Sequence, residues 1–160
     1  MAITCYFSLN GMPMSLLTCC GIGIFPAFSG QRYGRNNASL TAVKNVGAIP
    51  QGYYYIVGRQ SGGRLGDLRE AVLKYGYGTD RLEWFALYRA DGKIDDWTFI
   101  NGVKRGNFRL HPIGPMGLSE GCITLSYTTD FDYLRNQLLK TSMINVPGSQ
   151  MKAYGTIQVD

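Results

Sequence analysis

The sequence is poor in the residues that most catalytic and metal sites require. Only one of its 160 residues is histidine, His111, and only four are cysteine. Cys19 and Cys20 are adjacent, so in a strand their side chains face opposite ways and do not easily coordinate one metal ion. We therefore expect no metal and no cofactor, with zinc bound by His111 and the cysteines as the weaker alternative. Any chemistry that needs an imidazole must use His111.

Acidic residues are missing from the first part of the chain, where no Asp or Glu precedes Asp67. The whole chain has 16 Lys and Arg against 11 Asp and Glu, a net charge of +5. Such a surface favours anionic partners. The sequence has no Lys/Arg cluster, zinc-finger spacing or RNA-binding motif, so we expect no nucleic acid. An acidic cell-surface polymer or an acidic protein fits the charge equally well.

Long apolar runs are also missing. The N-terminal stretch MAITCYFSLNGMPMSLLTCCGIGIF has no basic start, and Asn10-Gly11 and Pro13 interrupt it too early for a membrane span. We expect no signal peptide and no membrane insertion. The stretch is read as folded structure, with a hairpin over residues 1–24 packed as part of one domain, 1–160.

What the sequence does contain favours a fold that is mainly β with a few helices. It has 21 Gly and 11 Tyr, and few long helical periods. Short helices are predicted over residues 67–74 and 130–140, the second capped by Thr129 and presenting an apolar stripe to the core. The predicted strands cover residues 3–9, 14–20, 21–30, 53–57, 82–90, 97–101, 107–110, 122–127 and 153–159.

Three of the four cysteines carry no predicted chemistry. A chain of this length and apolar content does not need a disulfide framework. We expect Cys5 and one of Cys19 and Cys20 to be buried as small, inert hydrophobic residues.

The fourth cysteine lies in a different setting, the run HPIGPMGLSEGC, which begins with His111 and ends with Cys122. Its three glycines and two prolines favour turns that bring its two ends back together. A free thiol is only a few per cent ionised at neutral pH, so a working cysteine needs a neighbour that takes its proton. His111 is the one imidazole that can do so. The alternative is that both residues only pack.

Gly121 and Ser119, which precede Cys122, also fit catalysis by a cysteine nucleophile. A sharp turn at Gly121 would aim backbone N–H groups at the place where a tetrahedral oxyanion forms beside the sulfur. The hydroxyl of Ser119 either adds a donor there or holds the loop.

The segment SEGCITL, preceded by the turn that contains His111-Pro112, resembles the signature of YkuD-like L,D-transpeptidase domains. Glu120 and Thr124 differ from that signature, in which His and then Arg or Asn are usual. Together with FPAFSG, GAIPQGYYYI and FINGVKRGNFRLHPIGPMG, the segment is more similar to L,D-transpeptidase and L,D-carboxypeptidase effectors of type VI secretion systems. This resemblance runs from about Phe25 to Leu125.

The resemblance implies a single-domain L,D-transpeptidase-like β-sandwich or barrel with a catalytic cysteine loop. Cys122 would be the nucleophile and His111 the base, acting on peptidoglycan stem peptides. The enzyme would cleave the bond between diaminopimelate and D-Ala, or exchange the terminal D-Ala for another D-amino acid. An antibacterial toxin of this kind would be made in the cytoplasm, carried by a secretion apparatus component to the periplasm of a target bacterium, and neutralised by an immunity protein.

Two further residues are candidates for substrate binding. Arg109 lies two positions before His111 and shares its strand face, so it can bind a stem carboxylate or simply be an exposed strand arginine. Glu120 either orients His111 or is a solvated loop charge.

Two alternatives to this enzyme remain open. The chain can be a non-catalytic cell-wall-binding β module, or a Cys-His cell-wall endopeptidase of a different fold. Papain-like hydrolases place the cysteine ahead of the histidine and at the start of a helix, whereas here the histidine comes first and a β run follows the cysteine.

Overall fold

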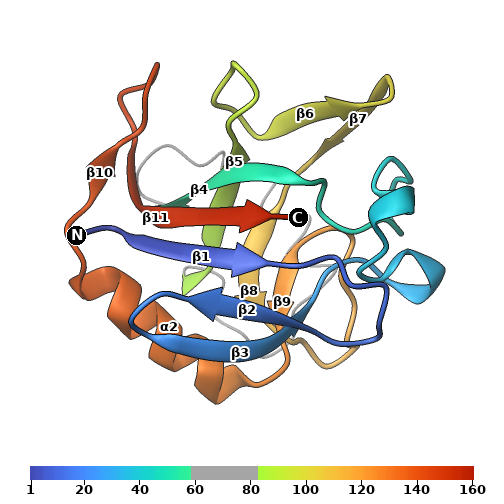
Figure 1. The fold of residues 1–160 in the computed structure, drawn as a ribbon, viewed down its shortest axis with the longest axis horizontal. Coiled ribbons are helices and arrows are strands. Elements are labelled where there is room, and N and C mark those ends of the chain that lie inside the picture. The colour runs from blue at the N-terminus through green and yellow to red at the C-terminus, as the bar shows by residue number, and fades with distance from the viewer. Residues whose placement is uncertain (59–82) are drawn as a thin grey trace.

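The strands of the chain close on themselves as a barrel, seen in a computed structural model that describes residues 1–58 and 83–160 (Figure 1). The order of paired strands is β1-β2-β3-β9-β8-β5-β4-β11, and β11 pairs back to β1 in parallel. Such closure leaves no unpaired sheet edge in the ring. The predicted mainly β class is confirmed. The ring strands are β1 (Ile3–Phe7), β2 (Ser15–Cys19), β3 (Gly23–Phe28), β4 (Gly52–Gly58), β5 (Phe85–Arg89), β8 (Arg109–Pro112), β9 (Ile123–Leu125) and β11 (Lys152–Val159).

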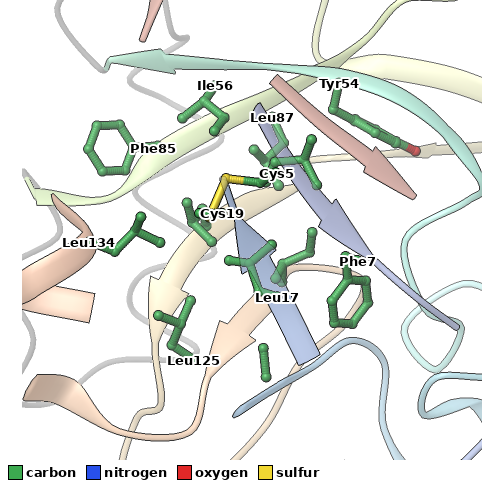
Figure 2. Packing of buried hydrophobic residues seen from close by; sticks show 14 of the residues in the cluster. Cys5, Phe7, Leu17, Cys19, Tyr54, Ile56, Phe85, Leu87, Leu125 and Leu134 are labelled. Carbon is green, nitrogen blue, oxygen red and sulfur yellow. A yellow bond between two sulfur atoms is a disulfide. The ribbon is translucent and has the colours of Figure 1, made fainter. Parts of the chain in front are cut away.

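The predicted N-terminal hairpin is confirmed, and it carries a bond that we did not expect. β1 and β2 are antiparallel, with Cys5 directly opposite Cys19. The two form a disulfide that lies in the core (Figure 2). The expectation that these cysteines only pack is therefore wrong. They are buried as predicted, but a cross-link between residues 14 apart also restricts the unfolded chain, which stabilises the fold by about 3 kcal/mol. Cys20 is free and exposed.

The polar stretch between β3 and β4 is a loop with two short 3-10 helices at Arg32–Gly34 and Ala38–Leu40. The aromatic run that follows is β4. Its central Tyr54 is fully buried and donates its hydroxyl to the carbonyl of Pro50 at 2.7 Å, while Tyr53 faces outward and is 42% exposed.

The segment between β5 and β8 differs from the prediction. β6 (Trp97–Ile100) pairs only with β7 (Val103–Gly106), in a separate two-stranded sheet that extends from the barrel at the upper right of Figure 1. β8 then pairs with β5, so the predicted run of successive strands is interrupted by this hairpin. The Asn101-Gly102 turn is the signal for it, because both residues have positive φ.

Helix α2 (Thr128–Lys140) packs against β8, β9 and β11. Its predicted apolar stripe is confirmed, since Phe131, Leu134 and Leu138 are buried. The predicted cap is wrong: Thr129 lies inside the first turn, and Tyr127 stands at the N-cap position without a side-chain bond. The helix predicted over residues 67–74 lies outside the described residues.

The core fills the barrel with side chains from most of its strands (Figure 2). Ile123 and Leu125 of β9 both point into it and are fully buried. A short strand, β10 (Ile144–Asn145), pairs with β11 outside the ring. Within the described ranges, none of the helices has both the length and the apolar character needed to cross a bilayer.

Candidate active site

The candidate site is built on two neighbouring parallel strands, β8 and β9. Their register puts Leu110 opposite Ile123 and His111 opposite Thr124. The turn-rich run between them therefore returns the chain beside itself, as predicted. Extending the register one step back puts Cys122 opposite Arg109.

Because strand side chains alternate between faces, these residues divide into two sets. Leu110 and Ile123 point into the core. His111 and Cys122 point the other way, on one shared face and one diagonal step apart. From the spacing of strands and of residues along them, the Cα atoms of such a pair lie about 8 Å apart.

His111 is held in one tautomer. Its Nδ1 lies 2.7 Å from the carbonyl oxygen of Pro112, which can only accept, so Nδ1 carries the hydrogen. Nε2 of the neutral ring is then an acceptor, and the hydroxyl of Thr124 lies 3.3 Å from it. Trp84 stacks on the imidazole with 4.3 Å between ring centroids. The ring is thus fixed in orientation with its basic nitrogen on the side of the β8–β9 face.

Burial keeps this imidazole neutral. The side chain is 1% exposed, and burial lowers the pKa of His111 to about 4. The hydrogen bond to the Pro112 carbonyl works in the opposite direction, and the positive charge of Arg109 adds to the lowering. At neutral pH the ring can therefore accept a proton, as a base requires.

The thiol of Cys122 is also enclosed. The residue is 4% exposed, and burial raises the pKa of Cys122 to about 11. The charge and the backbone of Arg109 lower this pKa, whereas the carboxylates of Glu120 and Asp96 raise it. The sulfur lies 3.7 Å from the carbonyl oxygen of Asn107. In this arrangement the thiol is protonated.

The loop before Cys122 is fixed by Ser119, which is fully buried. Its hydroxyl donates to the carbonyl of Cys122 at 2.8 Å and accepts from the N–H of Gly30 at 3.1 Å. Of the two roles considered for Ser119, the structure contains the loop-holding bonds.

Gly121 makes the turn that its position predicts. Its φ is +116°, where side chains are strained, and an added Cβ would lie 2.6 Å from Nη2 of Arg105 and 3.0 Å from the ring of Phe108. Only glycine fits this position without a shift of its neighbours.

Arg109 is not the exposed strand arginine that we considered. It is 2% exposed and forms a two-bond ion pair with Asp96, Nη1 to Oδ1 at 2.7 Å and Nη2 to Oδ2 at 2.8 Å. Its Nη1 also donates to the carbonyl of Phe108 at 2.8 Å. The guanidinium lies close enough to Cys122 and to His111 to influence the pKa of both. Its predicted contact with a stem carboxylate stays a prediction.

Glu120 is half-buried rather than freely solvated, and its charge reaches the Cys122 thiol. Its backbone carbonyl accepts from Nη2 of Arg105 at 3.3 Å. The predicted roles in orienting His111 or binding substrate stay predictions.

Sequence reasoning missed Arg105. This residue connects the loop that precedes Cys122, residues 113–121 (the candidate loop), to the rest of the barrel. The side chain is 4% exposed and also donates to the carbonyls of Thr41 and Gly47. It therefore joins residues 41–48 to the backbone beside Gly121. Nothing in the run VKRG marks this arginine as buried, because the strand alternation around it is too short.

Asp96, Trp84 and Thr124 were also missed as neighbours of the site. A buried arginine requires a carboxylate, but spacing alone does not say which one. In the sequence, Thr124 stands out only as a departure from the signature of YkuD-like L,D-transpeptidase domains. Among residues 1–58 and 83–160, no three side chains of His, Cys, Asp and Glu gather in a way that would hold a metal ion.

Comparison with known proteins gives the site a context. A family model described as the Tlde1 domain matches residues 23–149, which include both strands of the site and the loop between them. Among curated proteins, none matches this chain. Because the matched range is well over half of the sequence, the chain belongs to the Tlde1 domain family, the type VI secretion L,D-transpeptidase effectors that modify peptidoglycan.

Proposed function

We propose that this protein is a cysteine L,D-carboxypeptidase and L,D-transpeptidase that acts on peptidoglycan tetrapeptide stems. One observation carries the proposal: a neutral imidazole with a fixed tautomer and a cysteine thiol share one face of the β8–β9 pair, beside a buried arginine. Membership of the effector family supplies the substrate class.

The first step is removal of the thiol proton. Nε2 of His111 is the ring nitrogen without a hydrogen, and it takes the proton of Cys122 once the Thr124 hydroxyl turns away from it. A resting pKa of about 11 means that the thiolate forms only as the imidazole becomes charged beside it. The ion pair so formed is stabilised where neither ion alone would be.

The sulfur then attacks the carbonyl carbon of diaminopimelate, and a C–S bond forms while the carbonyl π electrons move to the oxygen. Backbone N–H groups at Gly121 and Cys122 are the proposed donors to this oxyanion. On collapse, the C–N bond to D-Ala breaks, and the imidazolium returns its proton to the departing amine. An acyl-enzyme on Cys122 remains.

The next acceptor decides the product. Water gives a tripeptide stem, a free D-amino acid gives an exchanged stem, and the amine of a neighbouring stem gives a cross-link. In each case His111 takes a proton from the acceptor as it attacks the thioester.

Arg109 contributes a fixed positive charge beside the sulfur. Its charge lowers the pKa of Cys122 against the larger effect of burial. Asp96 holds this guanidinium in place by two bonds, so the charge does not move with solvent. Contact of Arg109 with a stem carboxylate would require part of this pair to open.

The thiol must become accessible for any of these steps, because it is 4% exposed without substrate. Substrate entry therefore includes displacement of the atoms that cover Cys122. Such a requirement fits an effector that is kept in the producing cell and acts after delivery to the periplasm of a target bacterium. An immunity protein and a secretion apparatus component are the partners implied.

Two alternatives are tested together with the enzyme. A non-catalytic wall-binding module would bind muropeptides without changing their mass. The experiment is incubation of purified tetrapeptide muropeptides with the folded wild type and with Cys122→Ala, followed by mass spectrometry. We expect the wild type to remove one D-Ala, or to exchange it when another D-amino acid is added, and the variant to do neither. An unchanged tetrapeptide would reject the enzyme, and cleavage at an internal bond would favour an endopeptidase.

A further inference from the structure

A second feature lies beside the candidate loop: a hollow of about 470 Å³ between the turn of the first hairpin and the first 3-10 helix. Residues 11–13 form one wall, and Arg32, Tyr33, Arg35 and Asn37 form the other. A volume of this size suits a small ligand or part of a peptide.

The two walls are fixed to each other by Asn36, which is fully buried. Its backbone carbonyl accepts from the N–H of Gly11 at 2.7 Å, and its Nδ2 donates to the carbonyl of Met12 at 2.8 Å. Its Oδ1 accepts from the N–H of Ser29 at 2.9 Å. The hollow is therefore preformed, and a ligand would not have to order its walls.

The hollow carries two positive charges and no lining acid. Neither Arg32 nor Arg35 has an ion pair within the part of the chain that the structure describes, and no Asp or Glu occurs before Asp67. Nε of Arg35 is buried without a hydrogen-bond partner in that same part. Guanidinium groups in this state favour a carboxylate, which accepts from them in pairs.

One wall of the hollow also contacts the candidate loop. Nη2 of Arg35 lies 3.4 Å from the carbonyl of Gly117, and Gly30, just before the arginines, bonds to Ser119. A peptide that extends from Cys122 along this loop to Gly117 would meet Arg35 there. The apolar side chains of Met12 and Tyr33, 59% and 66% exposed, would flank it.

We propose that the hollow between residues 11–13 and Arg32–Asn37 binds a carboxylate of a short acidic peptide. This carboxylate belongs to a part of the peptide away from the bond that Cys122 attacks. The proposal rests on the proposed function for the identity of that peptide, the peptidoglycan stem. Arg32 and Arg35 supply the charge-assisted hydrogen bonds, and the rigid Asn36 framework sets their spacing.

The test uses Arg32→Gln, because Arg32 is exposed, whereas Arg35 also stacks on Phe28 and would disturb packing. Lys140→Gln is the matched control, since it removes one positive charge from the exposed end of α2. Both are made in the Cys122→Ala background so that the peptide is not consumed. Amide NMR titration with a tetrapeptide stem gives Kd and the location of the shifts.

We expect the shifts to centre on residues 11–13 and 32–37, and Kd to rise about tenfold in Arg32→Gln but not in Lys140→Gln. A peptide with its carboxylates converted to amides should bind about as weakly as the variant does to the native peptide. Equal affinity of the amidated peptide, shifts elsewhere, or an unchanged Kd in Arg32→Gln would overturn the proposal.

The experiments distinguish a failure of the carboxylate-binding proposal from a failure of the proposed enzymatic activity. If Arg32→Gln, with Cys122 intact, does not change turnover at low substrate concentration, carboxylate binding in the hollow is rejected and the proposed enzymatic activity is not. Carboxylate-dependent binding in the hollow without any turnover by the wild type rejects the enzyme instead.

Discussion

Arg109 donates two hydrogen bonds to the carboxylate of Asp96, from Nη1 to Oδ1 at 2.7 Å and from Nη2 to Oδ2 at 2.8 Å, and both side chains are almost fully buried. Arg109 lies on the strand face that carries Cys122, and the charges of both Arg109 and Asp96 influence the thiol. The ion pair is at once part of the fold and part of the electrostatic setting of the candidate nucleophile.

Asp96→Asn should be strongly destabilising, because it leaves the Arg109 charge buried without compensation. The expected loss is about 3–5 kcal/mol in the free energy of unfolding, measured by urea denaturation. Asp132→Asn on the exposed side of α2 is the control and should change stability by about 0.5 kcal/mol or less. Equal stability of the two variants would mean that the ion pair is not buried as described.

Cys122 should react slowly with iodoacetamide in the native protein. The thiol is enclosed and its pKa is raised, whereas Cys20 is free and exposed. At pH 7.5 we expect Cys20 to be alkylated at least about tenfold faster, as followed by peptide mapping. Similar rates for the two cysteines in the native protein would contradict the closed arrangement, and similar rates in urea are the control.

His111 should make stability depend on pH. Its pKa is about 4 when folded and 6.5 when unperturbed, so between these values the unfolded chain binds a proton that the folded chain does not. Stability that is present above pH 6.5 is therefore lost as the pH falls toward 4, by an amount on the order of 3 kcal/mol.

His111→Gln isolates this contribution. The variant should lose the part of the pH slope that lies between 6.5 and 4, whatever its stability at neutral pH. The measurement is urea denaturation at several pH values, and an identical slope in the wild type and the variant would contradict a buried neutral imidazole.

Gly121→Ala should damage the candidate loop more than a positive φ alone explains. Gly92 has a φ of +94° and open space around it, while Gly121 has a φ of +116° and meets Arg105 and Phe108. Gly92→Ala should cost about 1 kcal/mol, and Gly121→Ala should cost more and reduce turnover. Equal thermal stability and full turnover of Gly121→Ala would show that the turn tolerates a side chain.

Local patterns in the sequence predicted most of the strands and the apolar stripe of α2, since these depend on periodicity and turn residues. The barrel closure through the parallel β1–β11 and β8–β9 pairs depends on contacts between distant segments, which periodicity does not encode. The disulfide depends on register to one residue. In the observed register Cys5 faces Cys19, and a shift by one would have put Thr4 there instead.

In the candidate site, too, local sequence patterns predicted some residues, while others depend on contacts between distant segments. His111, Ser119, Gly121 and Cys122 lie within one run, so their residue types and the turn signals were enough to single them out. Asp96 and Arg105 come from the β6–β7 hairpin and its approach, and their burial follows only from how this hairpin packs on the barrel. No local pattern identifies a charged residue as buried when its partner is a carbonyl or carboxylate elsewhere in the chain.

The most direct test of the account is the amount of free D-alanine released from tetrapeptide muropeptides by the wild type, Cys122→Ala and Cys20→Ala. We predict release by the wild type and by Cys20→Ala at equal rates, and none by Cys122→Ala. Release by Cys122→Ala at the rate of the wild type, or no release by any of the three folded proteins, would contradict it.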